Sequence, residues 1–267
     1  MRIVLTIAGS DSIGGAGIQA DLKTLAALRV YGVSALTAIT AQNTHGIAES
    51  VALSSQIVRA QIEEVARDVE IAAIKTGMLA NGQIVKEVSE QVGRLRRQLV
   101  VDPVMAAGGV GARTLLAPEA VSIMKNSLLP LATLVTPNVA EASTLSGIPV
   151  DSISSAREAA KAIAGFGAQS VVVKGGHLNG PEAIDVLFHQ GQFAEFTAPR
   201  VDVGRIHGTG CTFASAIAAG LALGDDVPAA VQRAKRYITG AIEHSLVLGS
   251  GARILHHFWI QSRPGTL

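Results

Sequence analysis

The chain opens with the apolar run Ile3-Val4-Leu5-Thr6-Ile7-Ala8, which passes directly into the polar, glycine-rich stretch Gly9-Ser10-Asp11-Ser12-Ile13-Gly14-Gly15-Ala16-Gly17. A run that is apolar at nearly every position is typical of a strand buried on both faces of a parallel sheet. Arg2 followed by apolar residues is also how a signal peptide begins, but no Ala-x-Ala cleavage site follows. We therefore expect a first strand that ends in a loop able to approach a ligand closely.

The same alternation of short apolar runs and longer helical stretches continues along the chain. Buried strands are predicted at Ile3–Ala8, Val33–Ile39, Ala72–Thr76, Leu99–Asp102, Leu134–Thr136 and Ser170–Lys174. Edge or antiparallel strands are predicted at Glu49–Leu53, Ile184–His189 and Phe193–Ala198, the last two joined by a turn at Gly191. Helices are predicted near Ile18–Arg29, Gln56–Asp68, Gln83–Arg97, Pro118–Ser127, Val139–Leu145, Ala156–Phe166, Thr212–Leu223 and Val227–Leu246. This order predicts a doubly wound α/β sheet, and without a linker or repeat we expect one domain over residues 1–267.

The composition excludes several classes of protein. The chain has 267 residues, 48% of them apolar, with 22 Lys and Arg against 21 Asp and Glu. This balance argues against disorder and against a nucleic-acid partner, which would require a basic face. One Cys allows no intramolecular disulfide and no cysteine-rich zinc site. The longest uncharged apolar stretch, Phe213–Leu223, is shorter than the roughly 18 residues of a spanning helix. We expect a cytoplasmic protein with no membrane partner.

Polar and glycine residues collect where the predicted strands end. Ligands of doubly wound sheets bind beyond the carboxyl ends of the strands. The residues found there include Gln42 after the second strand, Asp102 before Pro103, and Lys174 before two glycines. We therefore expect a small-molecule site. Lys174 at a buried strand end requires an anion, either a bound phosphate, which we favour, or a carboxylate in a structural salt bridge. Asp102 is either a turn former or a ligand for Mg²⁺ or phosphates.

The sharpest local motif is His207-Gly208-Thr209-Gly210-Cys211-Thr212, directly before an apolar helix. Two glycines let backbone N–H groups approach a ligand, and the positive end of the helix favours phosphate. The alternative is an ordinary helix entry with Thr as the cap. Cys211 in the first helical turn is expected to have a thiol pKa below about 8.5 and to serve as a base or nucleophile, or else to be a small buried filler.

A second helix start carries Asn138 and Glu141. This pair fits a capping box, and it fits equally a hydrated Mg²⁺ held against phosphates. A classical nucleotide loop is absent, because no Gly-Lys pair occurs anywhere in the chain. The loose G-x-G-x-x-A match at Gly15 lies too far past the strand to indicate a dinucleotide site. The residues alone therefore predict a phosphate-handling α/β enzyme without a P-loop.

The segments taken together resemble the ribokinase superfamily and, within it, the hydroxymethylpyrimidine/phosphomethylpyrimidine kinases of thiamine biosynthesis. Their order and spacing agree to about residue 245. The matching stretches are Thr6–Ser12, Gly14–Thr24, Ala38–Thr44, Ile74–Leu79, Val101–Met105, Thr136–Ala142, Lys174–His177 and His207–Thr212. The resemblance implies a ribokinase-like three-layer fold, with a mostly parallel sheet and helices on both faces. It implies an ATP- and Mg²⁺-dependent kinase that phosphorylates 4-amino-5-hydroxymethyl-2-methylpyrimidine and then its monophosphate, and it suggests a homodimer.

The resemblance also implies roles for single residues. Substrate-binding roles fall on Gly9, Asp21, Gln42, Met78 and Val104, with Gln42 bonding the aminopyrimidine, Met78 packing on the ring and Asp21 near the hydroxymethyl group or its loop. Catalytic roles fall on Cys211, Lys174, Gly208 and Gly210, the two glycines forming an anion hole. Nucleotide contacts fall on Asn138, Glu141, Lys174, Thr209 and Gly210, and Mg²⁺ on Asp102 and Glu141. Many sugar kinases of the superfamily carry Asp where this chain has Cys211.

Three departures from the family pattern concern substrate range. They are Ile13 in place of Gly or Ser, Arg205-Ile206 in place of Asn-Thr, and the glycine-rich stretch Ala106–Gly111. A pyridoxal kinase is the first alternative, since pyridoxal also offers a ring CH₂OH, although Ala41-Gln42-Asn43-Thr44 favours the pyrimidine. A non-catalytic ligand-binding module on the same fold is the second. Retention of Lys174 and Glu141 argues against it.

Overall fold

A nine-stranded, mostly parallel sheet forms the centre of the computed structural model, which describes residues 1–106, 115–176, 178, 180–204, 206–249 and 252–261. The strand order is β3-β2-β1-β4-β5-β6-β7-β8-β9. The strands are β1 Ile3–Asp11, β2 Tyr31–Asn43, β3 Gly46–Ala52, β4 Ala73–Thr76, β5 Gln98–Val101, β6 Leu134–Val135, β7 Ser170–Val173, β8 Glu182–His189 and β9 Gln192–Pro199. The six central strands, in the order β2, β1, β4, β5, β6 and β7, pair in parallel. β3 at one edge and β8 and β9 at the other are antiparallel additions.

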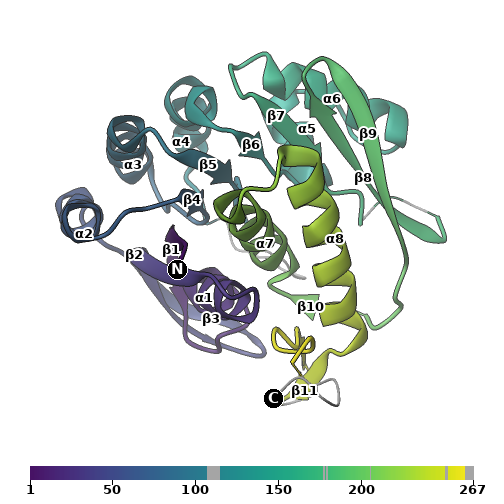
Figure 1. Cartoon of the computed structure of the whole chain (residues 1–267), viewed down its shortest axis with the longest axis horizontal. Helices are drawn as coiled ribbons and strands as arrows, with labels where there is room; N and C mark the ends of the chain where they lie inside the picture. The colour runs from purple at the N-terminus through teal and green to yellow at the C-terminus, as the bar shows by residue number, and fades with distance from the viewer. Residues whose placement is uncertain (107–114, 177, 179, 205, 250–251, 262–267) are drawn as a thin grey trace.

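Helices cover both faces of the sheet, so the molecule has three layers (Figure 1). One face packs against α2 Ser55–Asp68, α3 Gly82–Leu95, α4 Pro118–Ile123, α5 Val139–Ser146 and α6 Ile153–Ala164. The other face packs against α1 Gly17–Ala27, α7 Thr209–Leu223 and α8 Val227–Glu243. A π-helical turn at Met124–Leu128 and a 3₁₀ turn at Leu129–Leu131 follow α4. The three-layer arrangement confirms the predicted α/β fold.

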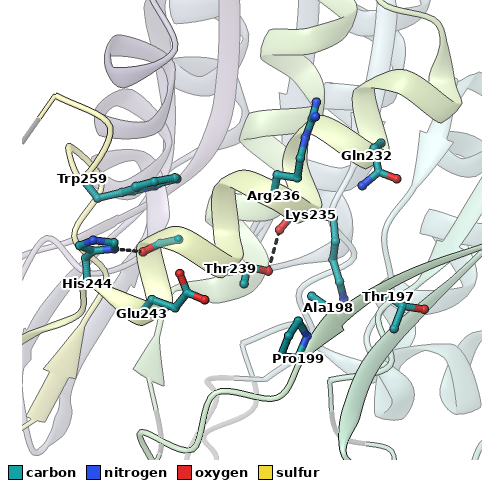
Figure 2. Close-up of a pocket in the computed structure, with 11 residues that line it drawn as sticks. Thr197, Ala198, Pro199, Gln232, Lys235, Arg236, Thr239, Glu243, His244 and Trp259 are labelled. Carbon is teal, nitrogen blue, oxygen red and sulfur yellow. Dashed lines mark hydrogen bonds between the residues drawn. The ribbon is translucent and has the colours of Figure 1, made fainter. Parts of the chain in front are cut away.

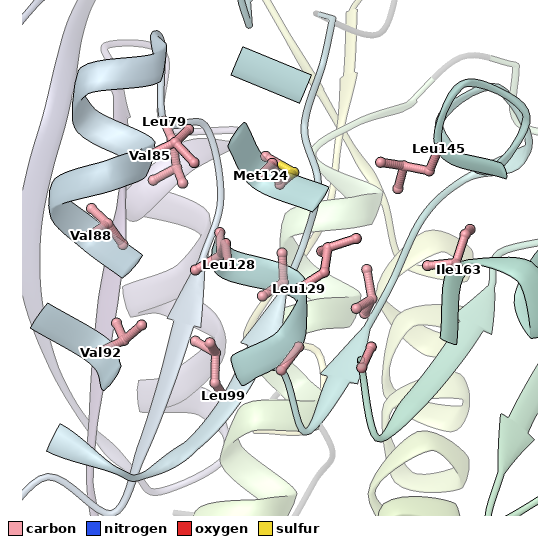
Figure 3. Close-up of a cluster of buried hydrophobic side chains, with 14 of the residues drawn as sticks. Leu79, Val85, Val88, Val92, Leu99, Met124, Leu128, Leu129, Leu145 and Ile163 are labelled. Carbon is pink, nitrogen blue, oxygen red and sulfur yellow. The ribbon is translucent and has the colours of Figure 1, made fainter. Parts of the chain in front are cut away.

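Each central strand divides its side chains between the two cores. Leu5 of β1 and Ile74 of β4 enter the cluster beneath α2 to α6, whereas Val4 and Ala73 enter the cluster beneath α7 and α8. Figure 3 shows part of the first cluster, where Val85, Val88 and Leu99 meet around the turn at Leu128. Because successive side chains of a strand point to opposite faces, two-sided burial makes every position apolar. The uninterrupted apolar runs in the sequence have this origin.

The helix starts follow the expected capping chemistry. Side chains of the N-cap residues accept from the third helical amide at Ser54, Asn81, Asn138, Ser152 and Asp226. The hairpin between β8 and β9 turns at Gln190-Gly191, both with positive φ, as predicted for a tight two-residue loop.

Most element bounds differ from the prediction by a few residues, and three differences stand out. β2 runs on to Asn43, because its end pairs with β3 instead of stopping at Ile39. α7 begins at Thr209, three residues early, and α8 ends at Glu243 instead of Leu246. A second, three-stranded sheet follows, formed by β10 Ile206–His207, β12 Ala252–Ile254 and β11 Leu246–Leu248. Its strands are only two or three residues long, and β10 pairs with β12 across about 50 positions, so no local pattern predicts that pairing. β11 and β12 are neighbours in the sequence, but strands of three residues are too short to show an alternating pattern.

No helix in the described part of the chain is both long and apolar enough to cross a membrane.

Candidate active site

The carboxyl ends of the parallel strands carry the polar residues that the sequence singled out. Gly9 lies at the end of β1, where the register with β2 shifts between Ala8 and Ser10. Gln42 lies at the end of β2, Asp102 directly after β5, and Lys174 directly after β7. Lys174 also forms an isolated parallel bridge with Asn138. Because the carboxyl ends of parallel strands lie on the same side of the sheet, these residues come together near the start of α7.

The first turn of α7 is not capped by a side chain. Its N-cap is Gly208 in the left-handed region, with φ +87° and no hydrogen bond from a capping side chain in the described part of the chain. The alternative considered above, an ordinary helix entry capped by Thr, is therefore wrong. A methyl group on Gly208 would lie 1.8 Å from the carbonyl oxygen of Gly15, so this position is open to Gly alone. The first amides of a helix have no intrahelical acceptor, so those of Thr209, Gly210 and Cys211 are available to an anion.

Lys174, Asp102 and Glu141 form a charged cluster beside this turn. Lys174 Nζ donates to Asp102 Oδ1 at 2.8 Å and lies 3.1 Å from the position of a Cβ on Gly210. Thr136 Oγ1 donates to the same carboxylate oxygen at 3.3 Å. The salt bridge to Asp102, considered above as the alternative for Lys174, is thus present. Burial opposes the charge of Lys174, but Asp102 and Glu141 raise the pKa of its ammonium group.

Glu141 takes part in a capping box. Asn138 N donates to Glu141 Oε2 at 2.8 Å, and Glu141 N donates to Asn138 Oδ1 at 2.9 Å. Burial raises the pKa of the Glu141 carboxyl to about 7, with a further contribution from Asp102 and opposition from Lys174. The capping role is therefore real. The backbone of Met105 also donates to this carboxyl group, so two backbone groups hold Glu141 beside the charges of Lys174 and Asp102.

The thiol of Cys211 corrects one expectation. The helix start was expected to lower its pKa, but burial raises the pKa to about 11, and the charges of Asp21 and Asp102 add to this effect. The ammonium of Lys75 and a hydrogen bond from the backbone of Gly17 oppose it without prevailing. Loss of water around the sulfur outweighs the helix end because desolvation acts on the whole charge of a thiolate. Cys211 is protonated at neutral pH in the free protein.

Asp21 is the second correction. Its side chain is fully buried in a salt bridge with the equally buried Lys75, whose Nζ lies 2.9 Å from both carboxylate oxygens. Thr6 and Ser215 donate to the same carboxylate at 2.6 and 2.7 Å. With all its accepting positions filled and no exposed surface, Asp21 does not offer an atom to a substrate. Asp21 lies in α1 and not in a loop, and the only sign of Lys75 in the sequence is the oddity of a Lys inside an apolar strand.

The remaining candidates for the substrate pocket lie around the end of β1. A methyl group on Gly9 would lie 3.2 Å from the sulfur of Met78, so these two residues are in contact. A methyl group on Gly17 would lie 2.4 Å from the carbonyl oxygen of Gly9, which joins this region to the loop that contacts Cys211. Val104 is partly exposed and donates its N–H to Asp102 O at 2.8 Å. Gly9, Met78 and Val104 are thus placed between the ends of β1, β4 and β5.

Two residues of the site were missed as functional candidates. His207 Nε2 lies 3.1 Å from Asp11 Oδ2 and 2.9 Å from Gln42 Nε2. Asp11 also accepts from the backbone N–H groups of Gly15 and Ala16. Burial opposes ionisation, but His207 and the amides of Ala16 and Ile13 lower the pKa of the Asp11 carboxyl. Contacts across 165 and 196 positions carry no local signal in the sequence.

Two of the departures fall partly or wholly outside the described residues, namely residues 107–111 and Arg205. A surface groove between α8 and β9, shown in Figure 2, contains none of the expected site residues. It is lined by Lys235, which pairs with buried Asp185, and by His244, whose ring stacks on Trp259 with centroids 5.4 Å apart. Its shape alone does not make it the active site, because the charged cluster and the uncapped helix start lie elsewhere.

Comparison with known proteins gives consistent matches over nearly the whole chain. A family model described as phosphomethylpyrimidine kinase matches residues 11–256. The hydroxymethylpyrimidine/phosphomethylpyrimidine kinase of Streptomyces coelicolor is 46% identical over 257 residues, which cover 96% of this chain and 94% of that protein. A thiamine biosynthesis bifunctional protein of Geobacter sulfurreducens is 48% identical over 255 residues, which cover 95% of this chain and 52% of that longer protein. An ADP complex of Bacillus subtilis pyridoxal kinase superposes with a TM-score of 0.91 at 38% identity, covering 98% of this chain and 100% of that one.

Proposed function

Since the chain belongs to the phosphomethylpyrimidine kinase family, we propose that it phosphorylates 4-amino-5-hydroxymethyl-2-methylpyrimidine and then its monophosphate in thiamine biosynthesis, with ATP as the phosphoryl donor. The observation that carries the proposal is the meeting of Lys174, Asp102 and the uncapped first turn of α7 at the strand ends. Phosphoryl transfer depends mainly on positioning and on neutralising charge; this cluster supplies the positioning and two carboxylates for the cation that would complete the neutralisation.

The chain divides the work between two sides of the site. On one side Gln42, Gly9, Met78 and Val104 bind the pyrimidine ring and present its alcohol. On the other, the N–H groups of Gly208, Thr209 and Gly210 donate to the phosphate oxygens, because a helix start combines N–H donors with a partial positive charge. Lys174 contacts the transferred phosphoryl group, and Asn138 contributes to binding the nucleotide.

Mg²⁺ fits the residues present. Asp102 and Glu141 offer two carboxylates, and Mg²⁺ in phosphate sites commonly takes one or two carboxylates, waters and phosphate oxygens. Against one ammonium group stand two acidic groups, so the fixed charges do not by themselves attract a triphosphate. A cation held by Asp102 and Glu141 would supply the missing positive charge. Titration with EDTA abolishes activity on this proposal, and added Mg²⁺ restores it.

Cys211 accepts the proton of the substrate alcohol on this proposal. Its thiol is protonated in the free protein, so a thiolate must first form. The ammonium group of Lys75 stabilises that thiolate, because it lowers the pKa that burial raises. Lys75 itself is tied to Asp21, and this pair holds the charge in place behind the reacting groups. The positioning role replaces the direct substrate contact expected for Asp21.

Pyridoxal phosphorylation is the second candidate, either as a side activity or as the main one. The similarity to a pyridoxal kinase, at a TM-score of 0.91, supports it as a related activity. Both alcohols are ring CH₂OH groups, so the transfer chemistry on the α7 side is the same for each.

A coupled assay of ADP release tests the proposal with three acceptors: the pyrimidine alcohol, its monophosphate and pyridoxal. We expect turnover of the first two with a higher kcat/KM than pyridoxal. A higher kcat/KM for pyridoxal would support the second candidate. Absence of ADP release with all three would instead support a non-catalytic binding module.

We also propose a cytoplasmic protein with a single domain over residues 1–267 that forms a homodimer. The exposed, cross-strand neighbours Ile39 and Val51 on β2 and β3 offer an apolar surface for a second copy, with 51% and 54% of their surface exposed. Light scattering that gives twice the chain mass, and a monomer for Ile39→Asp, would support this; a monomeric wild type would contradict it.

A further inference from the structure

Three side chains from separate parts of the chain meet at the edge of the proposed pyrimidine pocket. His207 on β10 contacts Asp11 at the end of β1 and Gln42 at the end of β2, both through its Nε2 atom. A methyl group on Gly15 would lie 2.9 Å from the His207 ring, so the ring is held against the loop after β1. A single ring nitrogen thus faces two hydrogen-bonding groups and carries either one proton or one lone pair.

The carboxylate of Asp11 determines whether His207 Nε2 carries the proton or the lone pair. Asp11 Oδ2 accepts from the amides of Gly15 and Ala16 at 3.0 and 2.8 Å, and Oδ1 accepts from that of Ile13 at 3.1 Å. These donors keep the carboxyl ionised, in line with its lowered pKa. A lone pair on His207 Nε2 would then face a negative oxygen at 3.1 Å, so Nε2 must carry the proton and donate it to Asp11.

This proton fixes the amide of Gln42. With an N–H at His207 Nε2, an amide NH₂ at 2.9 Å would oppose donor to donor, so the amide must turn its oxygen toward the ring. Turning the amide exchanges nitrogen and oxygen with almost no change of shape. Thr40 favours the same orientation. Its hydroxyl donates to Ser10 O at 2.8 Å, so toward Gln42 it can only accept, and the turned amide presents its NH₂ group to it.

We propose that His207, held by Asp11, is a positioning residue that sets the orientation of the Gln42 amide and thereby selects the aminopyrimidine alcohol over pyridoxal. The inference rests on the proposed function. Beside its CH₂OH group the pyrimidine carries an amino group, which donates, whereas pyridoxal carries an aldehyde, which accepts. The Gln42 oxygen keeps a second lone pair for the amino group, and its nitrogen keeps an N–H for the neighbouring ring nitrogen.

The test compares kcat and KM for both alcohols in the wild type, His207→Phe, His207→Gln and the control His189→Phe. His189 on β8 makes a similar hydrogen bond, to Ser170 on β7 at 2.7 Å, toward the opposite edge of the sheet from β1 and β2. We expect His207→Phe to raise the KM for the pyrimidine about tenfold or more, with kcat within about threefold and the preference over pyridoxal reduced about tenfold, equivalent to about 1.4 kcal/mol. His207→Gln, whose amide supplies an N–H in place of Nε2, restores the preference to within about threefold.

Several results would overturn the inference. They are an equal loss on both alcohols in His207→Phe, an unchanged preference, a His207→Gln variant no better than His207→Phe, or the same shift in the control. Asp11→Asn removes the demand for a proton at Nε2 and should lower the preference in the same direction, which keeps the test valid if His207→Phe does not fold. If the wild type turns over neither alcohol, the proposed function fails and this inference with it.

Discussion

The thiol of Cys211 makes a strong prediction for the pH dependence of phosphoryl transfer. Burial and two nearby carboxylates raise its pKa to about 11, and Lys75 only partly opposes them. If the thiolate accepts the proton of the alcohol, the active form is the deprotonated one. The rate of the chemical step must then rise with pH throughout the range below the pKa.

The size of the effect follows from that pKa. At pH 7, about four pH units below it, roughly one protein in 10⁴ carries the thiolate, and the fraction increases about tenfold per unit. The single-turnover rate should therefore rise about 100-fold between pH 7 and pH 9. Cys211→Ala should lower the rate about 10² to 10⁴-fold, the usual contribution of a positioned base, and should abolish the rise. Its KM for ATP should stay within about twofold.

The assay is rapid-quench single turnover with the pyrimidine alcohol at saturating Mg²⁺ and ATP, because product release then does not mask the chemical step. Cys211→Asp provides the matched variant, since its carboxylate is the base found in many sugar kinases of the superfamily and is expected to be ionised across this range. Its profile should be flat from pH 7 to pH 9. A wild-type rate that is constant from pH 6 to pH 9, or a Cys211→Ala variant that retains the rise, would refute the role of Cys211.

Three further predictions concern the framework of the site. Lys75→Met leaves the carboxylate of Asp21 buried without its cation and should reduce the free energy of unfolding by about 3–5 kcal/mol, measured by urea denaturation; adding Asp21→Asn should recover part of the loss. Gly208→Ala places a methyl group 1.8 Å from Gly15 O at φ +87° and should weaken ADP binding at least about tenfold by calorimetry. Glu141 has a folded-state pKa of about 7 against an ordinary 4.5, so the folded protein holds the proton more tightly than the unfolded chain. Stability without ligands should therefore fall by about 1–3 kcal/mol as pH rises from 4.5 to 7, and Glu141→Gln should remove that slope.

The sheet could be predicted because its signals are local. A strand such as Val171–Val173 is buried on both faces, and the requirement is written in consecutive apolar residues. The helix caps at Asn138 and Ser152 are equally local, since the side chain and the amide it binds are three residues apart. Ligands of doubly wound sheets bind beyond the carboxyl ends of the strands, and this rule correctly predicted that Lys174 and Asp102 lie together there.

The partners inside the site could not be predicted in the same way. Lys75 and Asp21 are 54 positions apart, and His207 and Asp11 are 196 apart, so neither pair leaves a spacing to recognise. The error in the pKa of Cys211 has a related cause. The sequence shows that the residue starts a helix, whereas the burial and the carboxylates of Asp21 and Asp102 that raise its pKa are brought together only by the fold.

The distribution of charge explains how a chain with a net charge of +1 is able to handle polyanionic substrates. Lys174, a cation beside the helix start, is already paired with Asp102 and faces Glu141, so it adds no net positive charge to the cluster. The helix start contributes only about half a positive charge. Free ATP would therefore meet a site that is neutral or negative, and only a nucleotide that brings its own divalent cation would be attracted. The two carboxylates thus work as a filter for the metal-bound nucleotide, and neutralising Asp102 should make ATP binding less dependent on Mg²⁺ even as catalysis declines.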